Sequence, residues 1–134
     1  RDALSKAEVP QDPALIRLME GERANPTAVR EELLRLRGTG LRFDAVMTSD
    51  DKLAQGALKY ALKAGLNVPG ELSIVGFNDS TLACCCEPEL SSVDNKLHSQ
   101  CAQCVDTLTA VLAGKDAPKR MVFSGELTRR GTTA

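Results

Sequence analysis

The sequence lacks the features that mark membrane proteins and nucleic-acid-binding proteins. No stretch approaches the roughly 18 consecutive apolar residues that a membrane span requires. Lysine and arginine (17 residues) nearly balance aspartate and glutamate (18 residues), so the formal net charge is −1 and no basic surface for phosphate groups is indicated. These absences favour a single globular domain of 134 residues, which we expect to contact neither lipid nor DNA.

The motifs of common catalytic sites are also missing. The chain has one histidine, no GxSxG motif and no glycine-rich loop of the phosphate-binding kind. Asp50 and Asp51 are adjacent carboxylates at the predicted start of a helix, where their side chains diverge instead of facing one substrate. We therefore expect this chain to bind a ligand without catalysing a reaction and to need no cofactor.

The five cysteines form a poor framework for disulfides, because their number is odd and Cys84, Cys85 and Cys86 are consecutive. Free thiols are typical of a reducing compartment, so we expect a cytoplasmic protein. Cys101 and Cys104 form a CxxC motif that could bind a metal together with His98, but zinc sites usually need a fourth ligand. We favour a buried apolar helix face instead, with no metal; its members are Leu97, Cys101, Cys104, Val105, Leu108 and Leu112.

Segments that resemble strands alternate with segments of helical periodicity. The chain opens inside what reads as a helix, so we expect a sequence cut from a longer protein. Apolar spacing, caps and glycines predict helices that begin at Pro26, Asp51 and Lys96 and end at Gly38, Gly65 and Gly114. Predicted strands span residues 13–19, 43–49, 72–77, 90–93 and 121–127, with short helical turns over 80–86. This alternation predicts an α/β fold with a parallel sheet and helices on both faces.

Polar residues follow two of the predicted strands. Thr48 to Asp51 follow the first, and Asn78 to Ser80 follow the second. In parallel sheets, ligands bind beyond the carboxyl ends of the strands. We therefore expect these two strand ends to lie side by side and to share one ligand.

Several segments together resemble the effector domain of LacI/GalR transcriptional regulators. They match, in order and at the family's spacing, its patterns DAV…NDxxAxGA, AGLxVPxDxSVVGFDD, PPLTTV and ELVxRxST. The matching residues of this chain are 43–58, 64–79, 87–93 and 125–133. Four motifs in the family's order are a far more specific signal than one GFND sequence alone.

The resemblance implies a Rossmann-like lobe of a periplasmic-binding-protein-like (type I) effector domain. Residues 1–134 would form the C-terminal lobe, without its central opening strand and without the DNA-binding headpiece. Helix 96–114 would pack on the other lobe, so its apolar face would here be exposed or buried against a neighbouring molecule, and 121–127 would be the final strand. The implied partners are a small sugar-like effector, a second subunit in a homodimer, and operator DNA through the headpiece only.

The resemblance also assigns ligand-binding positions. Asp50 stands where the family usually has an effector-binding asparagine, and Asn78 stands where many members have aspartate. Because a carboxylate only accepts hydrogen bonds, Asp50 favours a donor-rich ligand such as a polyol, sugar or amine. Arg23 and Asp79 are further candidates, each with a structural alternative: a solvated arginine and a capping residue. Asp50 has the same helix-capping alternative, and Asn78 with Asp79 could instead only shape the turn between strand and helix. For Asp51 we expect a structural role.

Two other functions remain open from the sequence. A LacI-like sensor region fused to a signalling enzyme would share this lobe, and so would a periplasmic solute-binding protein. The five cysteines argue mildly against the periplasm.

Overall fold

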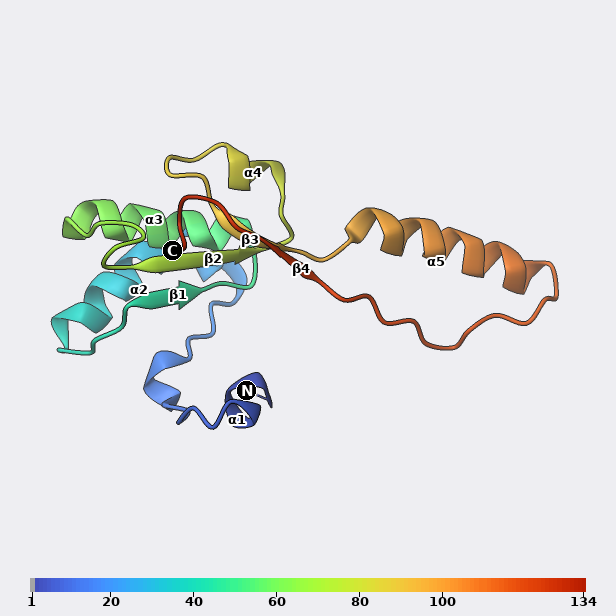
Figure 1. The fold of residues 1–134 in the computed structure, drawn as a ribbon, viewed down its shortest axis with the longest axis horizontal. Helices are drawn as coiled ribbons and strands as arrows, with labels where there is room; N and C mark the ends of the chain where they lie inside the picture. Colours follow the sequence, from blue (N-terminus) through green and yellow to red (C-terminus); the bar gives the residue numbers. More distant parts are fainter. Residues whose placement is uncertain (1) are drawn as a thin grey trace.

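The computed structural model describes residues 2–134 and forms a mixed α/β fold (Figure 1). The helices are α1 (Asp2–Lys6), α2 (Pro26–Gly38), α3 (Asp51–Ala64), α4 (Thr81–Cys84) and α5 (Leu97–Leu112). The strands are β1 (Ala45–Met47), β2 (Ser73–Phe77), β3 (Ser91–Asp94) and β4 (Glu126–Thr128). Two 3-10 turns, η1 (Pro13–Leu15) and η2 (Gly21–Arg23), precede α2.

The strands form one sheet in the order β1-β2-β3-β4. The pairs β1–β2 and β2–β3 are parallel, whereas β4 runs antiparallel to β3. The parallel core of the sheet is therefore confirmed, with an antiparallel edge strand added. Because the three parallel strands point the same way, their carboxyl ends share one edge of the sheet.

Local sequence signals explain the two long helices beside the sheet. The Asn25 side chain accepts a hydrogen bond from the Ala28 N–H, and Pro26 follows it at the first helical position. Helix α3 ends at Gly65, whose φ of 66° is a left-handed conformation that suits glycine. Gly56 lets α2 and α3 approach closely, since a Cβ there would lie 2.5 Å from the Pro26 carbonyl oxygen.

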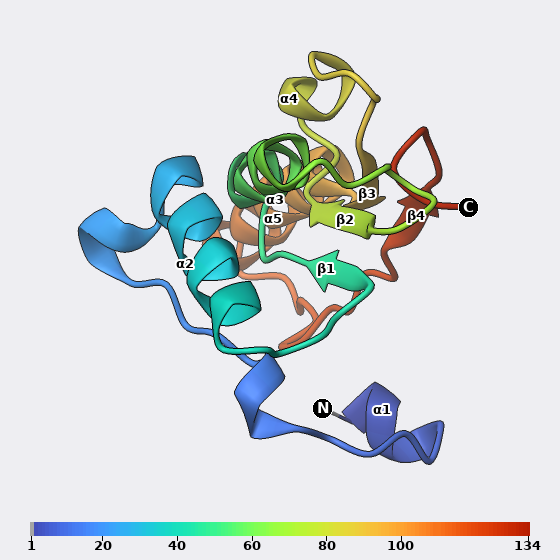
Figure 2. The same cartoon turned by 90° about the vertical axis from the view of Figure 1, so that its left-hand side faces the viewer.

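The hydrophobic core lies between α2, α3 and one face of the sheet. On β2, Ile74 is fully buried towards α3, while Val75 and Phe77 on the alternate face are only half-buried. Met47 on β1 is 71% exposed. Helices α2 and α3 lie on the same side of the sheet (Figure 2). The expectation of helices on both faces is wrong for residues 2–134, where no long helix covers the second face.

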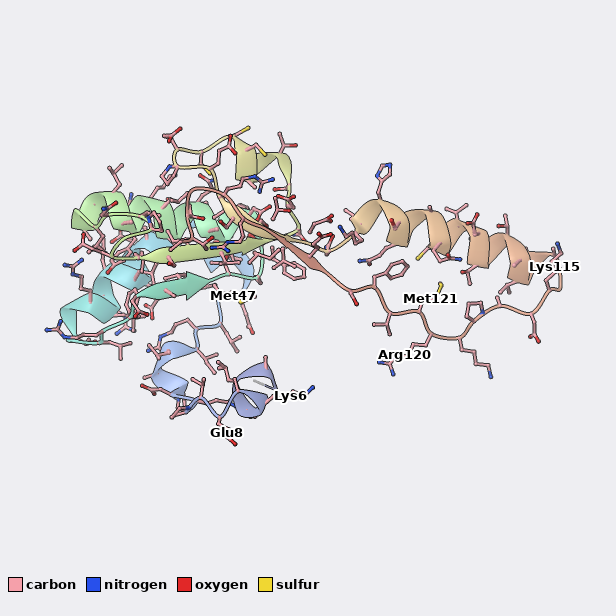
Figure 3. All side chains as sticks on the ribbon, in the orientation of Figure 1. Lys6, Glu8, Met47, Lys115, Arg120 and Met121 are labelled. Carbon is pink, nitrogen blue, oxygen red and sulfur yellow. The ribbon has the colours of Figure 1, made fainter. Side chains whose placement is uncertain are left out.

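Helix α5 and the segment that follows it form an arm that projects from the body (Figure 1). Lys115 lies at the far end of the arm and Met121 on its returning segment (Figure 3). None of the described residues of α5 is buried. Its exposed large apolar side chains are Leu97, Val105, Leu108, Val111 and Leu112. The exposure that the resemblance implies for this apolar face is confirmed. The burial expected of Cys101 and Cys104 is wrong, since both are exposed when no other lobe covers the helix.

An ion-pair network joins strands β3 and β4 at the base of the arm. Lys96 has a left-handed backbone, and its Nζ lies 2.9 Å from Asp94 Oδ2 and 2.8 Å from Glu126 Oε2. Asp94 and Glu126 are direct partners in the β3–β4 ladder. The Lys96 ammonium lowers the pKa of the Asp94 carboxyl, and the hydrogen bonds to Glu126 and Asp94 raise the pKa of Lys96.

Two strand predictions are wrong in detail. Residues 13–19 form the turn η1 and an irregular segment, with Leu18 83% exposed. The final strand covers 126–128 instead of 121–127. Both errors have one cause: a strand needs a neighbouring strand edge, and in residues 2–134 neither 13–19 nor 121–125 pairs with the sheet.

Candidate functional site

The carboxyl ends of β1, β2 and β3 meet at the edge of the sheet that faces the base of the arm. The Thr48 N–H donates to the Val75 carbonyl at 3.0 Å, and the Asn78 N–H donates to the Val93 carbonyl at 2.9 Å. These bonds hold residues 48–50, 78–80 and 95 at neighbouring strand tips. The prediction that the first two tips lie side by side on a parallel sheet is confirmed.

The buried side chain of Asp51 links these strand tips by hydrogen bonds. It is 1% exposed, and its Oδ2 accepts hydrogen bonds from the Ser80 N–H (2.7 Å) and the Ser80 hydroxyl (2.8 Å). Its Oδ1 accepts from the Ser92 hydroxyl at 2.5 Å. A Cβ on Gly76 would lie 2.2 Å from that Oδ1, so glycine is needed for the close approach. Asp51 is therefore structural, as expected from the sequence.

Asp50 is the N-cap of α3. Its Oδ1 accepts the Leu53 N–H at 2.7 Å, and the residue is half-buried. Among the side chains that the structure describes, which exclude those of Asp2 and Arg23, none forms a hydrogen bond with Oδ2 of Asp50. The capping role and a ligand contact are compatible, because each uses a different carboxylate oxygen.

Asn78 is exposed and has a φ of 95°, a backbone conformation in which asparagine is enriched. Its Oδ1 accepts a hydrogen bond from Asn95 Nδ2 at 2.8 Å, and Asn95 Oδ1 accepts from the Leu97 N–H at 3.1 Å. Sequence reasoning missed Asn95. One sequence signal could have identified it: Asn95 comes directly after β3, just as Asn78 comes directly after β2.

Asp79 is occupied by other protein groups. Arg130 Nη1 donates to its Oδ1 at 2.6 Å, and the Thr128 hydroxyl donates to its Oδ2 at 3.0 Å. The hydrogen bond to Asp79 raises the pKa of Arg130, which also donates to the Leu90 carbonyl at 2.8 Å. Asp79 thus ties the β2 tip to β4, and the expected capping of the next turn is wrong because Ser80 is the N-cap of α4.

A hollow of about 480 Å³, separate from Asp50 and Asn78, runs along the free edge of β1. Its walls come from β1, α2 and residues 15–19; the apolar lining includes Leu15, Leu18, Met19, Val29, Leu33, Leu36, Phe43 and Val46. It reaches the strand tips only at Thr48 and Ser49. The side chain of Arg23, the fourth predicted ligand residue, lies outside the described part of the structure.

The described residues show neither a metal-binding cluster nor a membrane span. Nowhere in 2–134 do three or more His, Cys, Asp or Glu side chains gather in an arrangement that could hold a metal ion. No helix in this range is both long and apolar enough to cross a bilayer.

Comparison with known proteins identifies the family. Residues 1–133 match the model of the periplasmic binding protein-like domain. An HTH-type transcriptional regulator of Lachnoclostridium phytofermentans is 37% identical over 98% of this chain and 38% of its own length. The GalR regulator of Salmonella typhimurium is 31% identical over 96% of this chain and 37% of its own length.

Solved structures agree with the sequence matches. The Escherichia coli repressor AscG superposes with a TM-score of 0.84 at 30% identity, over 99% of this chain and 48% of AscG. A complex of the regulator CelR with cellobiose superposes with a TM-score of 0.85 at 25% identity, over 98% of this chain and 40% of CelR. The chain spans less than half the length of each of these four proteins. It belongs to the periplasmic binding protein-like domain family, in the form found in LacI/GalR transcriptional regulators.

Proposed function

We propose that this chain is the effector-binding C-terminal lobe of a cytoplasmic LacI/GalR-type regulator, and that a sugar or similar polyhydroxyl metabolite binds at its strand tips. The observation that supports this most is that Asp50 and Asn78 follow the carboxyl ends of two adjacent parallel strands, β1 and β2. Ligands of α/β sheets bind at this edge. CelR, one of the similar structures, is a complex with cellobiose.

The proposed ligand contacts use the groups that the protein leaves free. Asp50 Oδ2 would accept a hydrogen bond from a ligand hydroxyl, while its Oδ1 continues to cap α3. The exposed amide of Asn78 would provide the second contact. From the sequence alone, Arg23 stays a proposed third contact that would stack on the ligand or bind an anionic group. Asp79 has both carboxylate oxygens engaged, so its proposed contribution is to position the Asn78 loop.

In the intact regulator, effector binding would change the position of this lobe relative to the other lobe. Effector would draw the lobes together around β3 and β4, and in a homodimer this closure would alter how the DNA-binding headpieces are held. A ligand can do this only if it binds the two states with different affinity, a coupling of typically 1–3 kcal/mol. The buried carboxylate of Asp51 accepts three hydrogen bonds from other protein groups, which supports a structural role for it over a catalytic one.

Operator release tests this function. The full-length regulator would be mixed with a fluorescent DNA site selected from a random pool, and its affinity measured by anisotropy with galactose, lactose, maltose or cellobiose present. We expect at least one sugar to change operator affinity about 5- to 150-fold. Unchanged operator affinity with every sugar would contradict the proposed effector class.

We further propose that another strand of the intact protein fills the apolar hollow beside β1. Asp44 and Thr48 direct backbone groups towards β2, so the N–H groups of Ala45 and Met47 point to the free edge. In hydrogen exchange of the full-length protein, the amides of Ala45 and Met47 are expected to be protected at least a hundredfold. Exchange at the rate of an unstructured chain would show that this edge stays open.

A further inference from the structure

Two asparagine side chains at the strand tips form a chain of hydrogen bonds that starts from the backbone. The Leu97 N–H donates to Asn95 Oδ1 at 3.1 Å, and Asn95 Nδ2 donates to Asn78 Oδ1 at 2.8 Å. Asn95 follows β3 and Asn78 follows β2, and these strands are neighbours in the sheet. The chain therefore crosses from the base of the arm to the candidate ligand site.

The backbone N–H at the start of this chain fixes the orientation of both amides. A backbone N–H can only donate, so the group of Asn95 that faces it must be the carbonyl oxygen. The Asn95 amino group then faces Asn78 and must meet its carbonyl oxygen. The amino group of Asn78 is left pointing away from Asn95, and no group in the described part of the structure accepts a hydrogen bond from it.

We infer that Asn95 is a positioning residue that makes position 78 a hydrogen-bond donor, so the bound effector presents an acceptor oxygen there. This inference rests on the proposed function for the identity of the site. Asp50 Oδ2 is an acceptor on the neighbouring tip, so the two tips offer opposite hydrogen-bonding polarity. Their common ligand would place an acceptor towards Asn78 and a donor towards Asp50.

Two single substitutions should reverse the polarity at position 78 by different routes. In Asn95→Asp, one carboxylate oxygen still accepts from the Leu97 N–H, and the other faces Asn78. The Asn78 amide then has to flip, so that its carbonyl oxygen points outward. In Asn78→Asp, Asn95 still donates to one oxygen and the second oxygen points outward. Aspartate is also tolerated at the φ of 95°.

Side-chain amide exchange tests the orientation without any effector. The full-length protein would be labelled with ¹⁵N-asparagine and followed by NMR. In the wild type we expect Asn95 to show a protected amide proton and Asn78 to exchange both protons fast. In Asn95→Asp, one Asn78 proton should become at least tenfold slower. Slow exchange at Asn78 in the wild type, or no change in the variant, would overturn the inference.

Calorimetry with cellobiose derivatives tests the consequence for binding. Each hydroxyl would be replaced in turn by fluorine, which only accepts, or by an ammonium group, which only donates. At the hydroxyl that faces Asn78, the wild type should bind the fluoro derivative at least tenfold tighter than the ammonium derivative. Both Asn78→Asp and Asn95→Asp should invert this ratio, whereas Asn95→Ala should bring it towards one. Asn67→Asp, in the exposed turn that follows α3, is the control for added charge and should leave this ratio unchanged.

The exchange experiment and the calorimetry together separate failure of the inference from failure of the proposed function. If cellobiose and its derivatives bind but the ratio does not invert in either variant, Asn95 does not set the polarity and the sugar site stands. If the exchange pattern is as expected but neither cellobiose nor any derivative binds the wild type, the orientation stands and cellobiose is not the effector; the operator assay with the other sugars then decides whether the sugar class is wrong.

Discussion

Asp51→Ala is expected to lower the free energy of unfolding by about 2–4 kcal/mol, the largest stability effect of any polar substitution at the site. The substitution leaves the Ser80 N–H and the Ser80 and Ser92 hydroxyls without their acceptor. Hydroxyls can turn towards other partners, but a backbone N–H cannot, and a buried unsatisfied group costs about 1–3 kcal/mol. Urea denaturation followed by circular dichroism would measure the change.

Two further variants make this result specific. Asp51→Asn keeps one acceptor oxygen for Ser80 and replaces the other by a donor, so its loss should be about half as large. Asp44→Ala removes an exposed carboxylate at the opposite end of β1 and should change the free energy of unfolding by less than about 0.5 kcal/mol. A loss from Asp51→Ala no greater than that from Asp44→Ala would show that the buried cluster does not hold the strand tips.

Replacing Asp50 is expected to weaken effector binding about 10- to 100-fold, the largest functional effect at the site. A hydrogen bond to a charged group contributes about 1.5–3 kcal/mol, which corresponds to this range of affinity. Asp50→Asn separates the functional role from the structural one, since asparagine caps a helix as well as aspartate does. Titration calorimetry with the best-binding sugar would measure the affinity of the full-length protein.

The stability and DNA affinity of these variants serve as controls. Asp50→Asn should unfold like the wild type, whereas Asp50→Ala loses the cap and about 1 kcal/mol. Both should bind operator normally in the absence of effector. Unchanged effector affinity in both variants would remove Asp50 from the ligand site and leave it with the capping role alone.

The sequence was most informative where structure depends on local chemistry. Helices α2 and α3 begin and end at signals carried within the same few residues, such as Asn25-Pro26 and Gly65. The strand β2 was predicted from its apolar run, because a central strand is buried whatever its neighbours are. The two strand tips then followed from where these elements stop.

Features that depend on distant pairing could not be predicted in this way. Residues 13–19 and 121–125 have strand-like composition, but only a neighbouring edge can make them strands. The Asp79–Arg130 ion pair joins residues 51 positions apart. Asn95 reaches Asn78 because of the register that places Val93 opposite Phe77, and no local pattern specifies that register.

A crystal structure of the full-length regulator with its best-binding sugar tests the central claim most directly. We expect the sugar at the carboxyl ends of β1 and β2, with one oxygen within hydrogen-bond distance of Asp50 Oδ2 and another within reach of the Asn78 amino group. A sugar bound in the hollow along β1, or anywhere without contact to either side chain, would contradict the proposed effector site.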